Sequence, residues 1–150
     1  NLASKALCGK GVSKQAFYLL PKIREAEALL LSSDRDGLDW LETHPELCFS
    51  SFNGSVPMED NKKTDAGFCE RKIILSRHIP VRTIERLLRS LMASVPRARC
   101  ARDDMMDALV CAAVARLDVT ERDCLPRGKQ EFDEVGLPMR ICYPIPAASQ

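Results

Sequence analysis

The sequence predicts one α/β domain over residues 1–150, rich in helix, with few strands. Apolar residues recur at helical spacing in most of the chain, whereas only two short stretches have the pattern of strands. A chain of 150 residues is of ordinary size for one domain. It can bury about 68–70% of its unfolded surface, so it can form a hydrophobic core without disulfides or bound metal ions.

The N-terminal segment 1–12 is small and polar and contains two glycines, which predicts a loop or a frayed start. Ser13 is a suitable N-cap for a helix that extends to about Leu31. Pro21 lies inside that helix, so we expect it to kink the helix or split it in two. The polar segment 32–37 then predicts a loop.

The stretch 41–54 contains the best strand candidate, which we expect to end near His44 because Pro45 lacks an amide donor. A short helical turn is expected to start at Pro45. Glu46 follows directly, and functional side chains often gather where strands end in α/β proteins. The alternative for Glu46 is a solvated surface carboxylate.

Three further helices are predicted in the second half of the chain. Thr64 should cap a helix that ends near Arg77, and Pro80 should start the next one. Asp103 is expected to cap a helix whose segment 108–115 is wholly apolar and therefore buried on most sides. The apolar stripe of the middle helix consists of Ile84, Leu87, Leu88, Leu91 and Met92.

The C-terminal region is predicted to contain a charged loop over 118–138, with one helical turn, and a short strand over 139–143. Two short strands do not form a stable independent sheet. They must therefore pair with each other against the helices, with strands outside this chain, or with a second copy.

Bulk properties restrict the class of protein. A formal net charge of +1 argues against a strongly basic module that wraps nucleic acid. The seven cysteines form no C-x-x-C pair, so we expect reduced thiols, no zinc site and a cytoplasmic protein. No segment reaches the roughly 18 apolar residues of a membrane span, so no membrane partner is expected.

Acidic residues at the start of the apolar helix suggest a metal site. Asp104 and Asp107 are three residues apart, so they share one helix face. Hard divalent cations need several carboxylate oxygens within about 2–2.5 Å. We therefore expect Glu46 and this aspartate cluster to form one site for a divalent metal, Mg²⁺ or Mn²⁺. The alternative is that the aspartates serve only as helix caps, which is favoured for Asp103.

Basic residues could position a phosphate-bearing partner. Lys62 and Lys63 precede a helix N-terminus, where free amides favour phosphate. Arg97, Arg99 and Arg102 could contact a nucleic-acid backbone. For both groups the alternative is a solvated basic loop.

Four segments, taken together and in order, resemble the domain-of-unknown-function 429 family, a group of predicted RNase H-like nucleases. They are GVSKQAFYLLPKIREAEALL at 11–30, HPELCFSSFNG at 44–54, KKTDAGFCER at 62–71 and DDMMDAL at 103–109. The resemblance covers most of residues 11–117.

The resemblance implies an RNase H-like fold, a mixed sheet flanked by helices, and a metal-dependent nuclease of the two-metal type. The Asp104 and Asp107 motif is similar to the late-helix motif of Holliday-junction resolvases, and Glu46 would match the central-strand carboxylate. The catalytic residues that the resemblance implies are Glu46, Asp104 and Asp107, with His44 and Lys63 beside them.

The first strand of that fold, with its aspartate, is expected to precede residue 1. The chain is therefore expected to be the C-terminal part of the domain, inactive as a fragment, and able to form a homodimer through an exposed strand edge. The competing interpretation is a non-catalytic oligomerisation or interaction module built around segment 108–115. Nucleotide binding is disfavoured because the chain lacks a glycine-rich phosphate loop.

Overall fold

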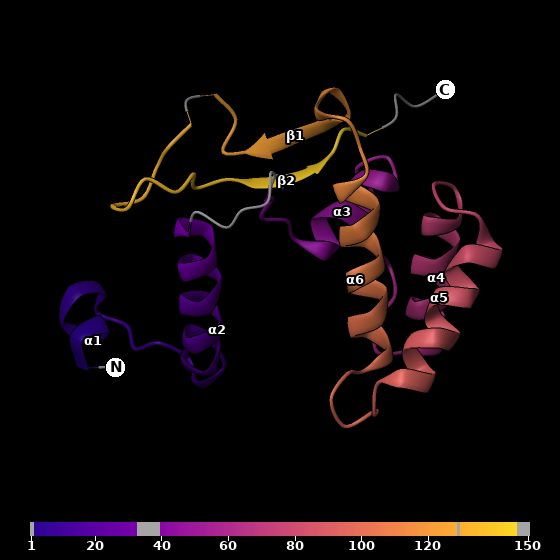
Figure 1. Ribbon diagram of the computed structural model, residues 1–150, viewed down its shortest axis with the longest axis horizontal. Helices are drawn as coiled ribbons and strands as arrows, with labels where there is room; N and C mark the ends of the chain where they lie inside the picture. Colours follow the sequence, from indigo (N-terminus) through magenta and orange to yellow (C-terminus); the bar gives the residue numbers. More distant parts are fainter. Residues whose placement is uncertain (1, 33–39, 129, 147–150) are drawn as a thin grey trace. The chain divides into compact units, whose positions relative to one another are not determined.

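The computed structural model describes residues 2–32, 40–128 and 130–146, which belong to two compact units, Asn1–Trp40 and Leu41–Gln150. These residues form a helix-rich α/β structure with six α-helices and a two-stranded antiparallel sheet (Figure 1). The helix-rich α/β class predicted from the sequence is confirmed. Apart from Ser32, the loop predicted at 32–37 lies outside the described residues.

The unit Asn1–Trp40 consists of α1 (Leu2–Cys8) and α2 (Lys14–Leu31). Ser13 caps α2 as predicted, because its Oγ accepts a hydrogen bond from the Ala16 amide at 3.1 Å. The loop predicted for 1–12 is wrong over α1, where alanine, leucine and lysine favour helix. The predicted split of α2 is not observed, since the helix continues through Pro21.

The unit Leu41–Gln150 is built on four helices. They are α3 (Pro45–Phe52), α4 (Asp65–Ser76), α5 (Val81–Ser94) and α6 (Arg102–Ala115). Thr64 caps α4 as predicted, since its Oγ1 accepts a hydrogen bond from the Gly67 amide at 3.0 Å. Pro45 occupies the first turn of α3, which confirms the helical turn expected there.

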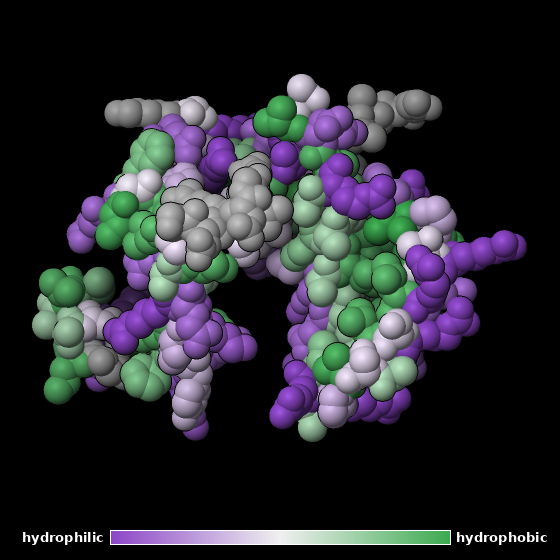
Figure 2. Space-filling view, in the orientation of Figure 1, coloured by the Kyte–Doolittle hydropathy of each residue, from purple (hydrophilic) through white to green (hydrophobic). Residues whose placement is uncertain are grey.

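Helix α6 supplies much of the hydrophobic core of this unit. It buries six side chains, Met105, Met106, Leu109, Val110, Ala113 and Val114. The opposite face is exposed at Ala108, Ala112 and Ala115, so burial on most sides is confirmed but is not complete. Apolar surface is visible along α6, bordered by hydrophilic side chains (Figure 2).

The stripe predicted on α5 is only partly buried. Ile84 and Leu88 enter the core at 0% and 6% exposure, whereas Leu87 and Met92 remain 38% and 44% exposed. The buried pair defines the face that packs on the other helices. Among the described residues, no helix is long and apolar enough to cross a membrane.

The sheet pairs β1 (Arg122–Leu125) with β2 (Ile141–Pro144), and a 3₁₀ turn, η1 (Val119–Glu121), precedes β1. The helical turn and the terminal strand were predicted, but β1 was not. Its four residues lack alternating apolar and polar positions, so pairing with β2 rather than local pattern defines it. The terminal strand predicted at 139–143 thus forms its sheet with β1, which was not predicted, and not with the stretch before Pro45.

The strand predicted before Pro45 is reduced to one bridge. Thr43 pairs in parallel with Cys142, and the Cys142 amide donates a hydrogen bond to the Glu42 carbonyl at 2.7 Å. Ser51 Oγ of α3 also donates to the Pro144 carbonyl at 2.5 Å. Strand β2 therefore joins β1 to the segment that leads into α3.

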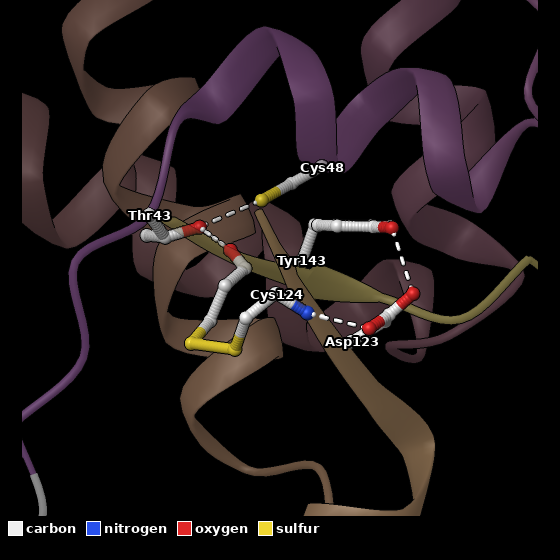
Figure 3. Close-up of a disulfide and its surroundings, with 6 residues drawn as sticks. Thr43, Cys48, Asp123, Cys124 and Tyr143 are labelled. Carbon is white, nitrogen blue, oxygen red and sulfur yellow. Dashed lines mark hydrogen bonds between the residues drawn. A yellow bond between two sulfur atoms is a disulfide. The ribbon is translucent and has the colours of Figure 1, made fainter. Parts of the chain in front are cut away.

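Cys124 and Cys142 form a disulfide across the sheet (Figure 3). The prediction that all cysteines are reduced is wrong for this pair, because the strand register places the two residues opposite each other. Thr43 Oγ1 donates a hydrogen bond to the Cys142 carbonyl at 2.7 Å and lies 2.9 Å from the buried Cys48 sulfur. The disulfide is thus connected to the start of α3.

Candidate functional site

An ion pair between α6 and the loop before α4 lies at the centre of the candidate site. Lys62 Nζ donates a hydrogen bond to Asp107 Oδ2 at 2.7 Å. The side chains are 33% and 18% exposed. The second oxygen, Asp107 Oδ1, is buried and has no hydrogen-bond partner among the described residues. A buried carboxylate oxygen without a partner is costly unless something else binds it.

Lys62 lies in the field of three carboxylates. Its pKa is raised, first by the hydrogen bond to Asp107 and, against the effect of desolvation, by the charges of Asp107, Asp103 and Glu46. Glu46 comes from α3, whereas the two aspartates come from α6. Carboxylates from sequence segments far apart therefore act on the same ammonium group.

Glu46 is held by a buried arginine. Arg71 Nη2 of α4 donates to both oxygens of Glu46, at 2.9 and 3.0 Å. Arg71 is 4% exposed, and its Nη1 also donates to the backbone carbonyls of Asp60 and Gly67. This bidentate geometry fixes the orientation of the Glu46 carboxylate in the first turn of α3.

The backbone that carries Lys62 is fixed to α4. Both oxygens of Glu70 accept backbone amides of the loop, from Glu59 at 2.9 Å and Asp60 at 3.2 Å. The loop also packs directly on Gly67, where a Cβ would lie 2.1 Å from the Asn61 carbonyl oxygen. A glycine is therefore required for this close approach.

Asp104 and Asp103 have different surroundings. Asp104 Oδ2 accepts a hydrogen bond from the Ala101 amide at 2.9 Å, so it satisfies a free donor at the start of α6. Ala101, rather than Asp103, is the N-cap residue, which makes the predicted cap wrong. Asp103 is half-buried and close enough to Lys62 for its charge to act there.

The remaining predicted catalytic residues are His44 and Lys63. His44 precedes α3, and its side chain makes no capping hydrogen bond. Lys63 is exposed and lines, with Lys62, Arg102, Asp103 and Asp104, a hollow open to solvent. The predicted lysine pair therefore borders a space that a ligand can enter.

The three predicted arginines are Arg97, Arg99 and Arg102, which lie near the start of α6. Arg102 pairs with Asp65 at 2.5 Å and stacks its guanidinium over the Phe68 ring at 4.3 Å. Arg102 also lines a second hollow that includes Arg97. Arg97 and Arg99 are exposed in the loop before α6. Arg102 thus borders both hollows.

No group of three or more histidine, cysteine, aspartate or glutamate side chains in the described part of the chain is arranged to hold a metal ion. Among the described residues, Asp107 Oδ1 is a buried carboxylate oxygen without a recorded partner, whereas both Glu46 oxygens accept hydrogen bonds from Arg71. The Lys62 ammonium now provides the positive charge among them.

The sequence analysis did not identify Arg71, although a signal was present. Arg71 lies at helical spacing from Gly67, Ile74 and Leu75, all of which are buried. A charged residue on the buried face of a helix indicates an ion pair. That signal points to Glu46 or another acid as its partner.

Comparison with protein families gives a match over most of the chain. The family model described as protein of unknown function (DUF429) matches residues 1–131. No curated protein and no solved structure gives a significant match.

Proposed function

The chain belongs to the family described as protein of unknown function DUF429, and from that premise we propose that it serves divalent-metal-dependent hydrolysis of phosphodiester bonds in nucleic acid, on an RNase H-like fold. The observation that carries this proposal is the cluster around Lys62. Asp107, Asp103 and Glu46 all act on one ammonium group, and Asp107 Oδ1 is buried without a partner.

Asp107 and Glu46 are the residues that would hold Mg²⁺ or Mn²⁺, with Asp104 one turn earlier on α6 as the third candidate. A cation held there would activate water and neutralise charge at the phosphate. Arg71 keeps the Glu46 carboxylate oriented through two hydrogen bonds. His44, directly before α3, is the candidate for proton transfer.

The basic side chains would bind the nucleic-acid backbone. Lys62 and Lys63 line one hollow, Arg97 lines the second, and Arg102 borders both. Contacts of this kind bind phosphates without reading sequence, so affinity should fall steeply with salt. Arg99, exposed in the same loop as Arg97, adds positive charge beside them.

Manganese binding, measured by electron paramagnetic resonance, tests the proposal without requiring turnover. Wild type should bind Mn²⁺, and Asp107→Asn should lose the binding because it removes the charge next to the unpartnered oxygen. Glu134→Gln, at an exposed carboxylate, is the matched control and should bind as wild type does. Equal Mn²⁺ binding by wild type and Asp107→Asn, or no binding at millimolar Mn²⁺, would refute the metal site.

A second candidate is a non-catalytic interaction module. It is favoured by the fact that Glu46 and Asp107 each already have a cationic partner, and by the exposed alanine face of α6. In that case the carboxylates only stabilise the fold, and the chain should self-associate, with the strand-edge homodimer as one form. Sedimentation velocity, together with the absence of Mn²⁺ binding, would favour this candidate over the hydrolase.

A further inference from the structure

We propose that the Cys124–Cys142 disulfide is a site of exchange with acidic thiols, that is, small thiols that carry a carboxylate, and that the mixed disulfide forms on Cys124. A hollow lined by arginines beside β1 binds the carboxylate and directs the sulfur of the thiol to Cys124. This inference does not depend on the proposed hydrolase, because it concerns the sheet and none of the residues around Lys62.

Cys124 is the member of the pair that a thiol in solution can reach. It is half-buried and lines a hollow of about 220 Å³ that is open to solvent. Cys142, in contrast, is 2% exposed. In thiol–disulfide exchange a thiolate attacks one sulfur and the other sulfur leaves, so access decides which sulfur is attacked. Attack therefore takes place on Cys124, and Cys142 is the leaving group.

Arginine side chains give this hollow its positive charge. Among the described residues its lining includes three of them, Arg122, Arg127 and Arg140, and one carboxylate, Asp123. Asp123 already pairs with Arg127 at 3.0 Å and accepts a hydrogen bond from the Tyr143 hydroxyl at 2.9 Å. The hollow therefore keeps a net positive charge, and guanidinium groups are well shaped to bind a carboxylate.

The strand register places two of these arginines beside the disulfide. Arg122 and Arg140 each lie two residues before one of the paired cysteines. Because side chains alternate along a strand, both belong to the face of the disulfide, one toward each end of it. Asp123 and Tyr143 belong to the other face, and Figure 3 shows their side chains directed away from the disulfide. A short thiol held by its carboxylate thus has its sulfur beside Cys124.

The exchange balances with the acidic thiol as the only other reactant. Its thiolate attacks Cys124 Sγ, the bond between the two cysteines breaks, and the electron pair leaves with the Cys142 sulfur, which takes a proton from water. The products are a mixed disulfide on Cys124 and a thiol at Cys142. A second acidic thiolate then releases Cys124, so that the two cysteines are reduced and the two acidic thiols are oxidised to their own disulfide.

The surroundings of Cys142 favour closing the bond again. Its amide donates a hydrogen bond to the Glu42 carbonyl at 2.7 Å, and its carbonyl accepts one from Thr43 Oγ1 at 2.7 Å. These bonds keep Cys142 opposite Cys124 after the disulfide opens. The nearby Cys48 does not compete, because burial raises the pKa of its thiol and keeps it protonated. The attacking thiolate therefore comes from solution.

The first experiment measures how fast 3-mercaptopropionate, which is anionic, and 2-mercaptoethanol, which is neutral, reduce the disulfide. Each rate constant is divided by the thiolate fraction, and the ratio of the two is compared between the folded chain and the chain unfolded in urea. The ratio should be on the order of tenfold higher in the folded chain and should approach the unfolded value at high ionic strength. Equal ratios in the two states would overturn the proposal.

The second experiment locates the selectivity. Arg140→Gln should slow 3-mercaptopropionate on the order of threefold and leave 2-mercaptoethanol unchanged, because it removes one positive charge from the hollow. Arg86→Gln, at an exposed arginine of α5, is the matched control and should leave both rates unchanged. An equal loss with both thiols in Arg140→Gln, or no loss with either, would refute carboxylate binding in the hollow.

The third experiment identifies the attacked sulfur. After brief treatment with 3-mercaptopropionate and an acid quench, trypsin separates the two cysteines, and mass spectrometry should find the adduct on Cys124. An adduct mainly on Cys142, or free thiols at both positions in the untreated protein, would overturn the proposal.

Discussion

Replacing Arg71 with methionine should destabilise the Leu41–Gln150 unit by about 2–4 kcal/mol. Arg71 is 4% exposed, and its loss removes two side-chain hydrogen bonds, to the carbonyls of Asp60 and Gly67, at about 1–1.5 kcal/mol each. Glu46 is 39% exposed, so water can solvate it and its contribution is small, at about 0–1 kcal/mol. Methionine retains most of the aliphatic packing.

Urea unfolding followed by circular dichroism measures this loss, with the free energy extrapolated to water. Arg116→Met, at an exposed arginine that follows α6, is the control and should stay within about 0.5 kcal/mol of wild type. A loss below about 1 kcal/mol in Arg71→Met would show that the Arg71 network does not hold the loop and Glu46 as described.

Three more predictions concern groups outside the candidate site. Thiol titration of the unfolded, unreduced chain should find Cys124 and Cys142 blocked, and replacing both with serine should cost about 3 kcal/mol in the free energy of unfolding, because the bond closes an 18-residue separation. Free thiols in both positions would refute the disulfide. The pKa of His78 is lowered, first by burial, so the folded state favours neutral histidine. Stability from this group is complete above its ordinary pKa, near 6.5, and is lost as pH falls below it, so the pH dependence of unfolding below about pH 7 should flatten in His78→Gln. Burial raises the pKa of Cys111 to about 11, so iodoacetamide at pH 8 should label the exposed Cys8 and Cys69 well before Cys111. Equal labelling rates would contradict the packing of Cys111 against the hydrophobic core.

Local features of the fold could be predicted from the sequence because the residues that determine them are adjacent. The caps at Ser13 and Thr64 and the start of α3 at Pro45 each depend on a side chain and the next few backbone groups. Strand β1 could not be predicted, since Arg122–Leu125 becomes a strand only by pairing with a partner far along the chain. The disulfide could not be predicted either, because the pairing of β1 with β2 is what places Cys124 opposite Cys142.

The candidate site also contains residues that the local sequence predicts and contacts that it does not. Asp107 stood out because it precedes a wholly apolar segment, and Lys62 because it precedes a helix. Their pairing joins residues 45 positions apart, and no local pattern encodes it. Asp104 shows the reverse case. Spacing and the family resemblance assigned this side chain to a metal, but it accepts a hydrogen bond from the Ala101 amide at the start of α6.

A crystal structure of the protein soaked in Mn²⁺, with data collected to measure anomalous scattering, tests the central claim most directly. The account predicts an anomalous peak in contact with Asp107 Oδ1 and the Glu46 carboxylate. The contradictory result is the absence of a peak at this cluster, with Lys62 Nζ still bonded to Asp107 at 2.7 Å.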